Sequence, residues 1–153
     1  MALVVNALAQ SHPDDTCWRP LGSGVRSEPN PEYSEVRALG VFEGDLIAGG
    51  YFTHAGEVFA RRIARWNGTS WSNIGDGIVD LRDETGAVVN CLGTYNDQLF
   101  AGGFFRNYDP NAQLGMVARW NGSSWQSVCG AGDHFGTSGC LNGPVSTLKS
   151  FEG

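Results

Sequence analysis

The amino-acid sequence predicts an all-β fold, and three observations support this prediction. The chain has 153 residues, of which 41% are hydrophobic, so it is long enough and apolar enough for a packed domain. Only 17% of the residues are charged, whereas 22 are glycine, about twice the usual share. A segment of four short apolar runs, separated by turn residues, recurs along the chain. Many short strands joined by glycine-rich turns are typical of repeated β-sheets.

The first strand of the recurring unit is VRALGVFEG at residues 36–44, which returns as VNCLGTYND at residues 89–97, an offset of 53. A tight turn follows in each copy, Glu43-Gly44-Asp45 in the first and Asn96-Asp97 in the second, and it predicts a hairpin with the next strand. Simple alternation divides the side chains of this strand between two faces. One face would carry Val36, Ala38 and Gly40, and the other would carry Arg37, Leu39 and Val41.

The second strand is LIAGGYF at residues 46–52, which returns as LFAGGFF at residues 99–105. It is apolar on both faces, which predicts burial on both sides. Its glycine pair, Gly49-Gly50 in the first copy and Gly102-Gly103 in the second, leaves no side chain on either face. A glycine pair allows a close backbone approach, so we predict that neighbouring sheets crowd together there.

The third and fourth strands form a second predicted hairpin, RIARWNGTSWSNIG at residues 62–75. Its turn, Asn67-Gly68, is a strong hairpin signal because both residues tolerate positive φ, and Asn121-Gly122 repeats it. Tryptophans flank each turn: Trp66 and Trp71 in one copy, Trp120 and Trp125 in the other. The loops before these hairpins, residues 53–61 and 106–115, differ between the copies, so we expect any specific function to lie there or in the connections between units.

An antiparallel sheet of four short strands that repeats every 53 residues or so indicates a β-propeller blade. We therefore predict a partial β-propeller built of four-stranded antiparallel blades. Residues 1–35 would form a partial blade and a connecting loop, residues 36–88 and 89–144 two blades, and residues 145–153 the first strand of a further blade. Two explanations of the incomplete ring stay open: an excerpt of a longer repeat protein, or several chains that complete a ring or assembly together.

The first residues carry a weaker copy of the pattern. VVNALAQ at residues 4–10 resembles VVNCLGT at residues 88–94, so it is either a first-strand or a third-strand segment of a shortened unit. CWRPLGSGV at residues 17–25 matches SWSNIGDGI at residues 70–78. The apolar start lacks a basic region, so it predicts a strand rather than a signal peptide.

Charge and hydropathy exclude some partners. The net charge of −6 and the pI near 4.9 disfavour binding to nucleic acids and to anionic membranes. No run approaches the ~18 apolar residues that a membrane-spanning helix needs.

The four cysteines form no Cys-x-x-Cys motif, so the sequence does not predict a zinc site. Cys129 and Cys140 bracket a glycine-rich loop, where a disulfide is geometrically easy and would suit an extracellular setting. Two free thiols are the alternative. Cys91 stands at an apolar strand position and is predicted to be a small core residue.

The repeat as a whole, with AGG, IARWNGTSW and the lead-in LNGPVSTL, resembles the galactose-oxidase/kelch-like β-propeller repeats of secreted and cell-surface bacterial proteins. Related repeats occur in a fungal cell-polarity surface protein family, and the resemblance covers residues 17–153. It implies an extracellular or cell-surface location and a role in scaffolding, adhesion or ligand display. The copper site of galactose oxidase does not carry over. The histidines His12, His54 and His134 match none of its positions.

Several side chains are candidate sites, each with a plainer interpretation. Trp66 and Trp120, with Arg65 and Arg119 before them, could bind a sugar, or they could pack between blades. The loop acids Asp76, Asp80 and Asp83, with Glu84, could bind Ca²⁺ as a cofactor, or they could be solvated. Asn67 and Asn121 lie in N-glycosylation sequons that also serve as turns.

The sequence contains no nucleophile motif and no phosphate-binding loop, so we predict that the chain is not an enzyme. The predicted function is an extracellular structural, adhesive or partner-binding module whose partner is a protein, a glycan or another copy of the chain. One alternative is a lectin-like propeller that binds carbohydrate through Trp66 and Trp120. A second is a fragment of a propeller enzyme whose catalytic residues lie elsewhere.

Overall fold

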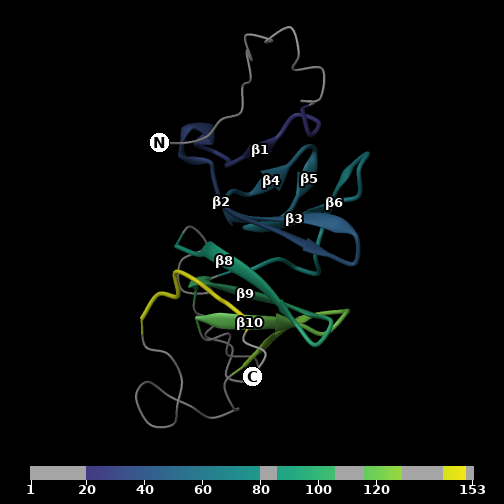
Figure 1. The fold of residues 1–153 in the computed structure, drawn as a ribbon. Coiled ribbons are helices and arrows are strands. Elements are labelled where there is room, and N and C mark those ends of the chain that lie inside the picture. The colour runs from purple at the N-terminus through teal and green to yellow at the C-terminus, as the bar shows by residue number, and fades with distance from the viewer. Residues whose placement is uncertain (1–19, 80–85, 106–115, 129–142, 151–153) are drawn as a thin grey trace, which may run out of the picture.

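The computed structural model describes residues 20–79, 86–105, 116–128 and 143–150, which form three antiparallel β-sheets (Figure 1). The predicted all-β fold is therefore confirmed. Within these ranges the one helical element is η1, a 3₁₀ turn at Pro31–Tyr33. No helix in the described part of the chain is long and apolar enough to cross a membrane.

The first sheet has the strand order β2-β3-β6-β7. Its strands are β2 (Glu35–Phe42), β3 (Asp45–Tyr51), β6 (Ile63–Trp66) and β7 (Trp71–Asn73). Phe42 pairs with Asp45 across a two-residue turn, in which Glu43 (φ 53°) and Gly44 (φ 84°) are both left-handed. This backbone matches the right-handed twist of the two strands, as the hairpin prediction required.

The second sheet repeats the first, with the order β8-β9-β10-β11. Its strands are β8 (Val88–Tyr95), β9 (Gln98–Phe104), β10 (Val117–Trp120) and β11 (Trp125–Ser127). Asn96 (φ 48°) and Asp97 (φ 55°) form the equivalent two-residue turn. The two four-stranded antiparallel units and both hairpins of each unit are thus confirmed.

A third, small sheet lies on the first unit. Its order is β1-β4-β5, from β1 (Val25–Arg26), β4 (His54–Ala55) and β5 (Val58–Phe59). The sequence did not predict these strands, because residues 53–61 show no alternation and were expected to form a loop.

The three sheets lie in layers, with the first sheet between the small sheet and the second sheet (Figure 1). The core between the first and second sheets contains the fully buried side chains Ile47, Ile63, Ile78, Val89, Leu99 and Phe105. The core on the other face of the first sheet contains Ala48, Phe52, Ala55, Ala60, Ala64 and Trp71. This layering confirms the predicted burial of β3 on both sides, whereas in β9 Phe104 is 39% exposed, so burial on both sides is not confirmed for that strand.

The first glycine of each pair meets the next unit. A Cβ on Gly49 would lie 2.5 Å from Cγ1 of Val89 in the second sheet, and a Cβ on Gly102 would lie 2.8 Å from Cγ1 of Val145. Val145 belongs to the segment 143–150, which lies against the second sheet and donates from its backbone N–H to the carbonyl of Gly103. The predicted crowding of neighbouring units at the glycine pair is therefore confirmed for this glycine.

The second glycine of each pair is crowded by its own sheet instead. A Cβ on Gly50 would lie 2.0 Å from the carbonyl oxygen of Glu35, and a Cβ on Gly103 would lie 2.0 Å from that of Val88. Both carbonyls belong to the first strand of the same hairpin. The second glycine of each pair is therefore required by the backbone of its own hairpin and not by contact between units.

A β-bulge explains this shape and corrects one prediction. It falls between Val36 and Ala38 in β2 and between Val89 and Cys91 in β8. Val89 packs against the first sheet, whereas Cys91 lies on the opposite face, beside residues 143–150. The extra residue of a bulge inverts the alternation beyond it. The prediction that Val36 shares a face with Ala38 and Gly40 was therefore wrong, and Val36 lies on the same face as Leu39.

The second hairpin is also built differently from the prediction, although its position is correct. Gly68 has a positive φ of 94°, but Asn67 is not among the residues with positive φ. Its side-chain oxygen instead accepts hydrogen bonds from the backbone N–H groups of Thr69 and Ser70, both at 2.9 Å. Asparagine therefore stabilises this four-residue loop through its side chain. The loop at Asn121 has the same bonds.

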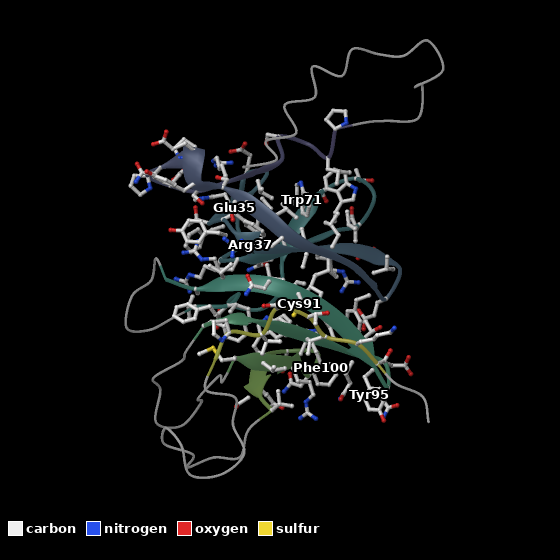
Figure 2. All side chains as sticks on the ribbon, turned by 60° about the vertical axis from the view of Figure 1, so that its left-hand side comes forward. Glu35, Arg37, Trp71, Cys91, Tyr95 and Phe100 are labelled. Atoms are coloured by element: carbon white, nitrogen blue, oxygen red, sulfur yellow. The ribbon has the colours of Figure 1, made fainter. Side chains whose placement is uncertain are left out.

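Polar side chains also link the units. Arg37 Nη1 donates to Asn90 Oδ1 at 3.0 Å and pairs through Nη2 with Glu35 at 2.7 Å. Asn90 Nδ2 in turn donates to the carbonyl of Val145 at 3.2 Å. Figure 2 shows Glu35 and Arg37 near the start of β2, whereas Tyr95 lies at the far end of β8. The links therefore join the start of β2 to β8, and β8 to residues 143–150, which form no strand of their own in the structure although a first strand was predicted from residue 145.

The burial of Cys91 can be tested by measuring how the stability of the chain depends on pH. It is a buried free thiol, which confirms its prediction as a core residue, and burial raises its pKa above the ordinary value. Below the unfolded-state pKa of about 8.5, the thiol is protonated in both states and adds no pH dependence. Above it, the unfolded state binds fewer protons than the folded state, so stability falls as pH rises through the folded pKa.

We therefore expect the free energy of unfolding in urea to decrease above about pH 8.5, with Cys91 contributing at most about 1.4 kcal/mol per pH unit. Cys91→Ala should reduce this decrease, and alanine suits the site because Ala38 occupies the matched position. Equal slopes for the two proteins between about pH 8.5 and pH 10 would contradict the expectation.

Candidate functional surface

Residues 53–62 form the candidate functional surface, because they differ most from their counterpart in the second unit. The chain reverses at Gly56, whose left-handed φ of 57° suits glycine. Arg26 of β1 donates from Nη1 to the carbonyl of Gly56 and pairs with Glu57 at 3.5 Å. The small sheet therefore holds the tip of this segment at both its backbone and its side chains.

An exposed aromatic side chain with a histidine and an arginine beside it lies on this segment. Phe59 is 50% exposed, and its ring meets that of His54 edge-on, with 5.2 Å between centroids. The guanidinium of Arg61 lies 4.9 Å from the Phe59 centroid, a cation–π contact. No acid in the described part of the chain forms an ion pair with Arg61. His54, Phe59 and Arg61 together form the Phe59 cluster.

The backbone beneath the Phe59 cluster is strained and tied to the core. Arg61 (φ 40°) and Arg62 (φ 74°) are consecutive left-handed residues that are not glycine, which is uncommon. Arg62 is only 3% exposed, and its Nη1 donates to the carbonyl of Phe52 at 3.0 Å. The backbone N–H of Ile78 donates to the carbonyl of Arg61 at 2.9 Å. The connection to the second unit thus holds Arg61 in place.

The tryptophans predicted as binding candidates lie against the cores. Trp66 packs on Trp71 with 5.3 Å between ring centroids, and Trp120 packs on Trp125 at 5.5 Å. Trp66 and Trp120 are partly buried, and a Cβ on Gly75 would lie 2.7 Å from Cζ3 of Trp120. This contact supports the packing role. Sugar binding by Trp66 and Trp120 stays a prediction.

The tryptophan on the last strand of each sheet also donates a hydrogen bond from its indole N–H to a backbone carbonyl about 50 residues earlier in the chain. Trp71 Nε1 donates to the carbonyl of Leu21 at 2.8 Å, and Trp125 Nε1 donates to that of Ile74 at 3.0 Å. Leu21 and Ile74 occupy matched positions, 53 residues apart. The two units therefore hold the segment that precedes them in the same way.

The two candidate arginines have different partners. Arg65 donates from Nε to Asp45 and from Nη1 to Glu43 at 3.0 Å, and the bond to Asp45 is the main cause that raises the pKa of Arg65. Arg119 donates instead to Gln126 at 3.1 Å. The second unit has Gln98 and Asn96 where the first has the two acids. Arg65 thus pairs with acids of its own unit, between β6 and the β2–β3 hairpin.

The other candidates are only partly covered by the described residues. Asp76 is exposed, while Asp80, Asp83 and Glu84 lie outside the described ranges, as do Cys129 and Cys140. The described residues include no group of three or more side chains that could hold a metal ion. Asn67 and Asn121 are both exposed, and glycosylation at these positions stays a prediction.

The Phe59 cluster was not predicted from the sequence, because His54, Phe59 and Arg61 do not form a recognisable sequence motif. His54 and Phe59 come together only through the pairing of β4 with β5, whose strands have two residues each. The available signal was indirect: residues 53–61 differ from their counterpart while the flanking strands agree.

Comparison with known proteins found no matching family model, no matching curated protein and no matching solved structure.

Proposed function

We propose that the chain is part of a β-propeller and acts as a non-enzymatic, extracellular structural, adhesive or partner-binding module. The observation that carries this proposal is one packing arrangement used twice. Val89 enters the space left by Gly49 in the first sheet, and Val145 enters the space left by Gly102 in the second. A β-propeller is a series of four-stranded sheets that pack face to face through such repeated contacts.

The contrast between similar strands and different connecting segments supports the binding role. The strands share their packing residues, so sequence differences are concentrated in the segments between them. A rigid scaffold with variable connections is the usual arrangement of a binding module. The resemblance to repeats of secreted and surface proteins supports an extracellular location.

We place the partner contact on the Phe59 cluster. Its exposed ring offers an apolar surface, and the Arg61 guanidinium offers planar hydrogen-bond donors for a carboxylate or sulfate group. The strained Arg61–Arg62 backbone keeps the cluster in one geometry, which lowers the entropy lost on binding. A protein or a glycan with acidic groups fits this chemistry.

Ligand arrays test the proposal. We expect the purified chain to bind a component of an acidic-glycan or extracellular-protein array, and Phe59→Ser/Arg61→Ser to weaken that binding by roughly tenfold or more, because the substitutions remove both the ring and the guanidinium. Tyr33→Ser is the matched control, since Tyr33 is a 60% exposed aromatic residue on η1. Titration by surface plasmon resonance measures both.

Equal affinity of the double variant and the original chain would contradict the place of the contact. Catalytic turnover by the purified chain would contradict the non-enzymatic role. Loss of glycan binding in Trp66→Ala or Trp120→Ala, with the Phe59 double variant unchanged, would favour the lectin-like alternative.

A further inference from the structure

One face of the first sheet is open where the same face of the second sheet is covered. The exposure of each side chain in the first sheet can be compared with that of its counterpart 53 residues later in the second sheet. Leu39 is 64% exposed whereas Leu92 is partly buried, Val36 is partly buried whereas Val89 is 0% exposed, and Leu46 is partly buried whereas Leu99 is 1% exposed. The small sheet covers another part of this face, around Ala48, Ala64 and Trp71.

The covered copies show what kind of segment fits there. A Cβ built on Gly40 of β2 would lie 3.5 Å from the Cβ of Leu92 in the next unit. A Cβ built on Gly93 of β8 would lie 3.3 Å from the Cβ of Leu148 in residues 143–150. At both steps the first strand of one unit presents a small residue to the leucine of the next. Leu39 is the leucine that lacks such a partner among the described residues.

Residues 4–10, which lie outside the described ranges, have the sequence of such a strand. VVNALAQ shares four of its seven residues with VVNCLGT of β8. In this alignment Ala9 stands at the position of Gly93, and Ala7 stands at the position of Cys91, where the first unit has Ala38. Alanine fits at the glycine position, because the Cβ distance of 3.5 Å at Gly40 is an ordinary contact and that of 3.3 Å at Gly93 needs the leucine to shift by only a few tenths of an ångström.

We propose that residues 4–10 pack as an additional first strand on the open face of the first sheet, with Ala9 against Leu39. The choice between a first and a third strand is made by this fit. The alignment also supplies a polar contact: Asn90 Nδ2 donates to the carbonyl of Val145, so Asn6 is placed to donate to the carbonyl of Val36.

The chain between residues 10 and 20 is long enough for this placement. Residues 21 and 22 lie at the outer strands of the first sheet, beside Trp71 and Trp66. Crossing a four-stranded sheet from its first to its last strand takes about 14 Å, at roughly 4.8 Å per step. The nine intervening residues can span up to about 30 Å.

Disulfide trapping tests the proposal directly. A disulfide needs a Cβ–Cβ distance of about 3.5–4.5 Å, close to the separation found at both covered steps. The variant is Ala9→Cys/Leu39→Cys in a background with Cys91→Ala and serine at positions 17, 129 and 140. Under mild oxidation we expect an intramolecular disulfide in most of the protein, read as a mass loss of about 2 Da and faster migration on a non-reducing gel.

Two control pairs make the result decisive. Gly40→Cys/Leu92→Cys joins the equivalent described positions and should close readily. Leu8→Cys/Leu39→Cys should not close, because neighbouring residues of a strand point to opposite faces. The proposal fails if the Ala9 pair stays reduced while the Gly40 pair closes, or if both pairs at Leu39 close equally. It also fails if the disulfides join two chains, since a second copy would then cover the face.

Hydrogen exchange gives a readout that needs no added cysteine. In the unaltered chain the amides of residues 4–10 should exchange at least roughly tenfold more slowly than unstructured amides. Leu39→Asp should abolish this protection while the amides of β8 and β9 stay protected. Fast exchange of residues 4–10 in the unaltered chain, or protection unchanged by Leu39→Asp, would overturn the proposal.

Discussion

Gly50→Ala is expected to lower the free energy of unfolding by about 3 kcal/mol or more. The added Cβ would lie 2.0 Å from the carbonyl oxygen of Glu35 and 3.0 Å from Cα of Val36. Both atoms are backbone atoms of β2 next to the β-bulge, so no side-chain rotation relieves the overlap. The hairpin would have to open at the bulge, next to the core on the face of the first sheet that meets the small sheet. Urea unfolding followed by far-UV circular dichroism measures the loss.

Gly40→Ala is the matched control for this substitution. It adds the same methyl group to the same hairpin, but its Cβ would lie 3.5 Å from the Cβ of Leu92, an ordinary contact. We expect a change within about 1 kcal/mol. If the two variants were equally stable, Gly50 would not lie against the bulge as the structure shows it.

Trp125→Ala is expected to destabilise the chain by about 3–5 kcal/mol, because it removes a large buried side chain from the core between the two units. Trp125 is 9% exposed, and it holds the carbonyl of Ile74 through Nε1 at 3.0 Å. Trp125→Phe retains much of the apolar contact but leaves that carbonyl without its donor, so about 1–3 kcal/mol should be lost. Calorimetry and far-UV circular dichroism avoid the fluorescence change that the substitution causes.

Tyr95→Ala serves as the comparison, since Tyr95 is also an aromatic residue of the second sheet but is 53% exposed. Its loss should change stability by less than about 1 kcal/mol. A Trp125→Phe variant as stable as the original chain would mean that the bond to Ile74 contributes nothing. A large effect of Tyr95→Ala would mean that the exposed end of β8 is covered in solution.

The strand order of both units could be predicted because it depends on local pairing. The strands of each four-stranded sheet pair in chain order, although β4 and β5 intervene between β3 and β6, and the turns at Glu43-Gly44 and Asn67-Gly68 contain residues that favour a reversal. Each strand and turn pattern also occurs in both copies of the repeat, whereas an accidental pattern would be present in one copy only. Crowding at Gly49 followed from the absence of a side chain in a strand that is apolar on both faces.

What escaped prediction depends on non-local pairing or on a single extra residue. The small sheet needs Val25 to pair with Ala55, thirty residues away, in strands of only two residues. The bulge at Val36 has no sequence signal beyond the glycine opposite it, and it inverts the expected faces. The Phe59 cluster depends on that small sheet, so its side chains could be named from the sequence only as members of a variable loop.

The contact of Leu92 with Gly40 recurs as the contact of Leu148 with Gly93, which gives the stack a symmetry that neither sheet has alone. The glycine face of one unit meets the leucine face of the next. Because these are two different surfaces, the interface between successive units is heterologous. Applied again and again, one fixed rotation generates either a closed ring or an open superhelix, depending on its angle. Gly40 and Gly93 lie at these two contacts, so side chains larger than alanine at both positions should push the units apart in the same way at each contact.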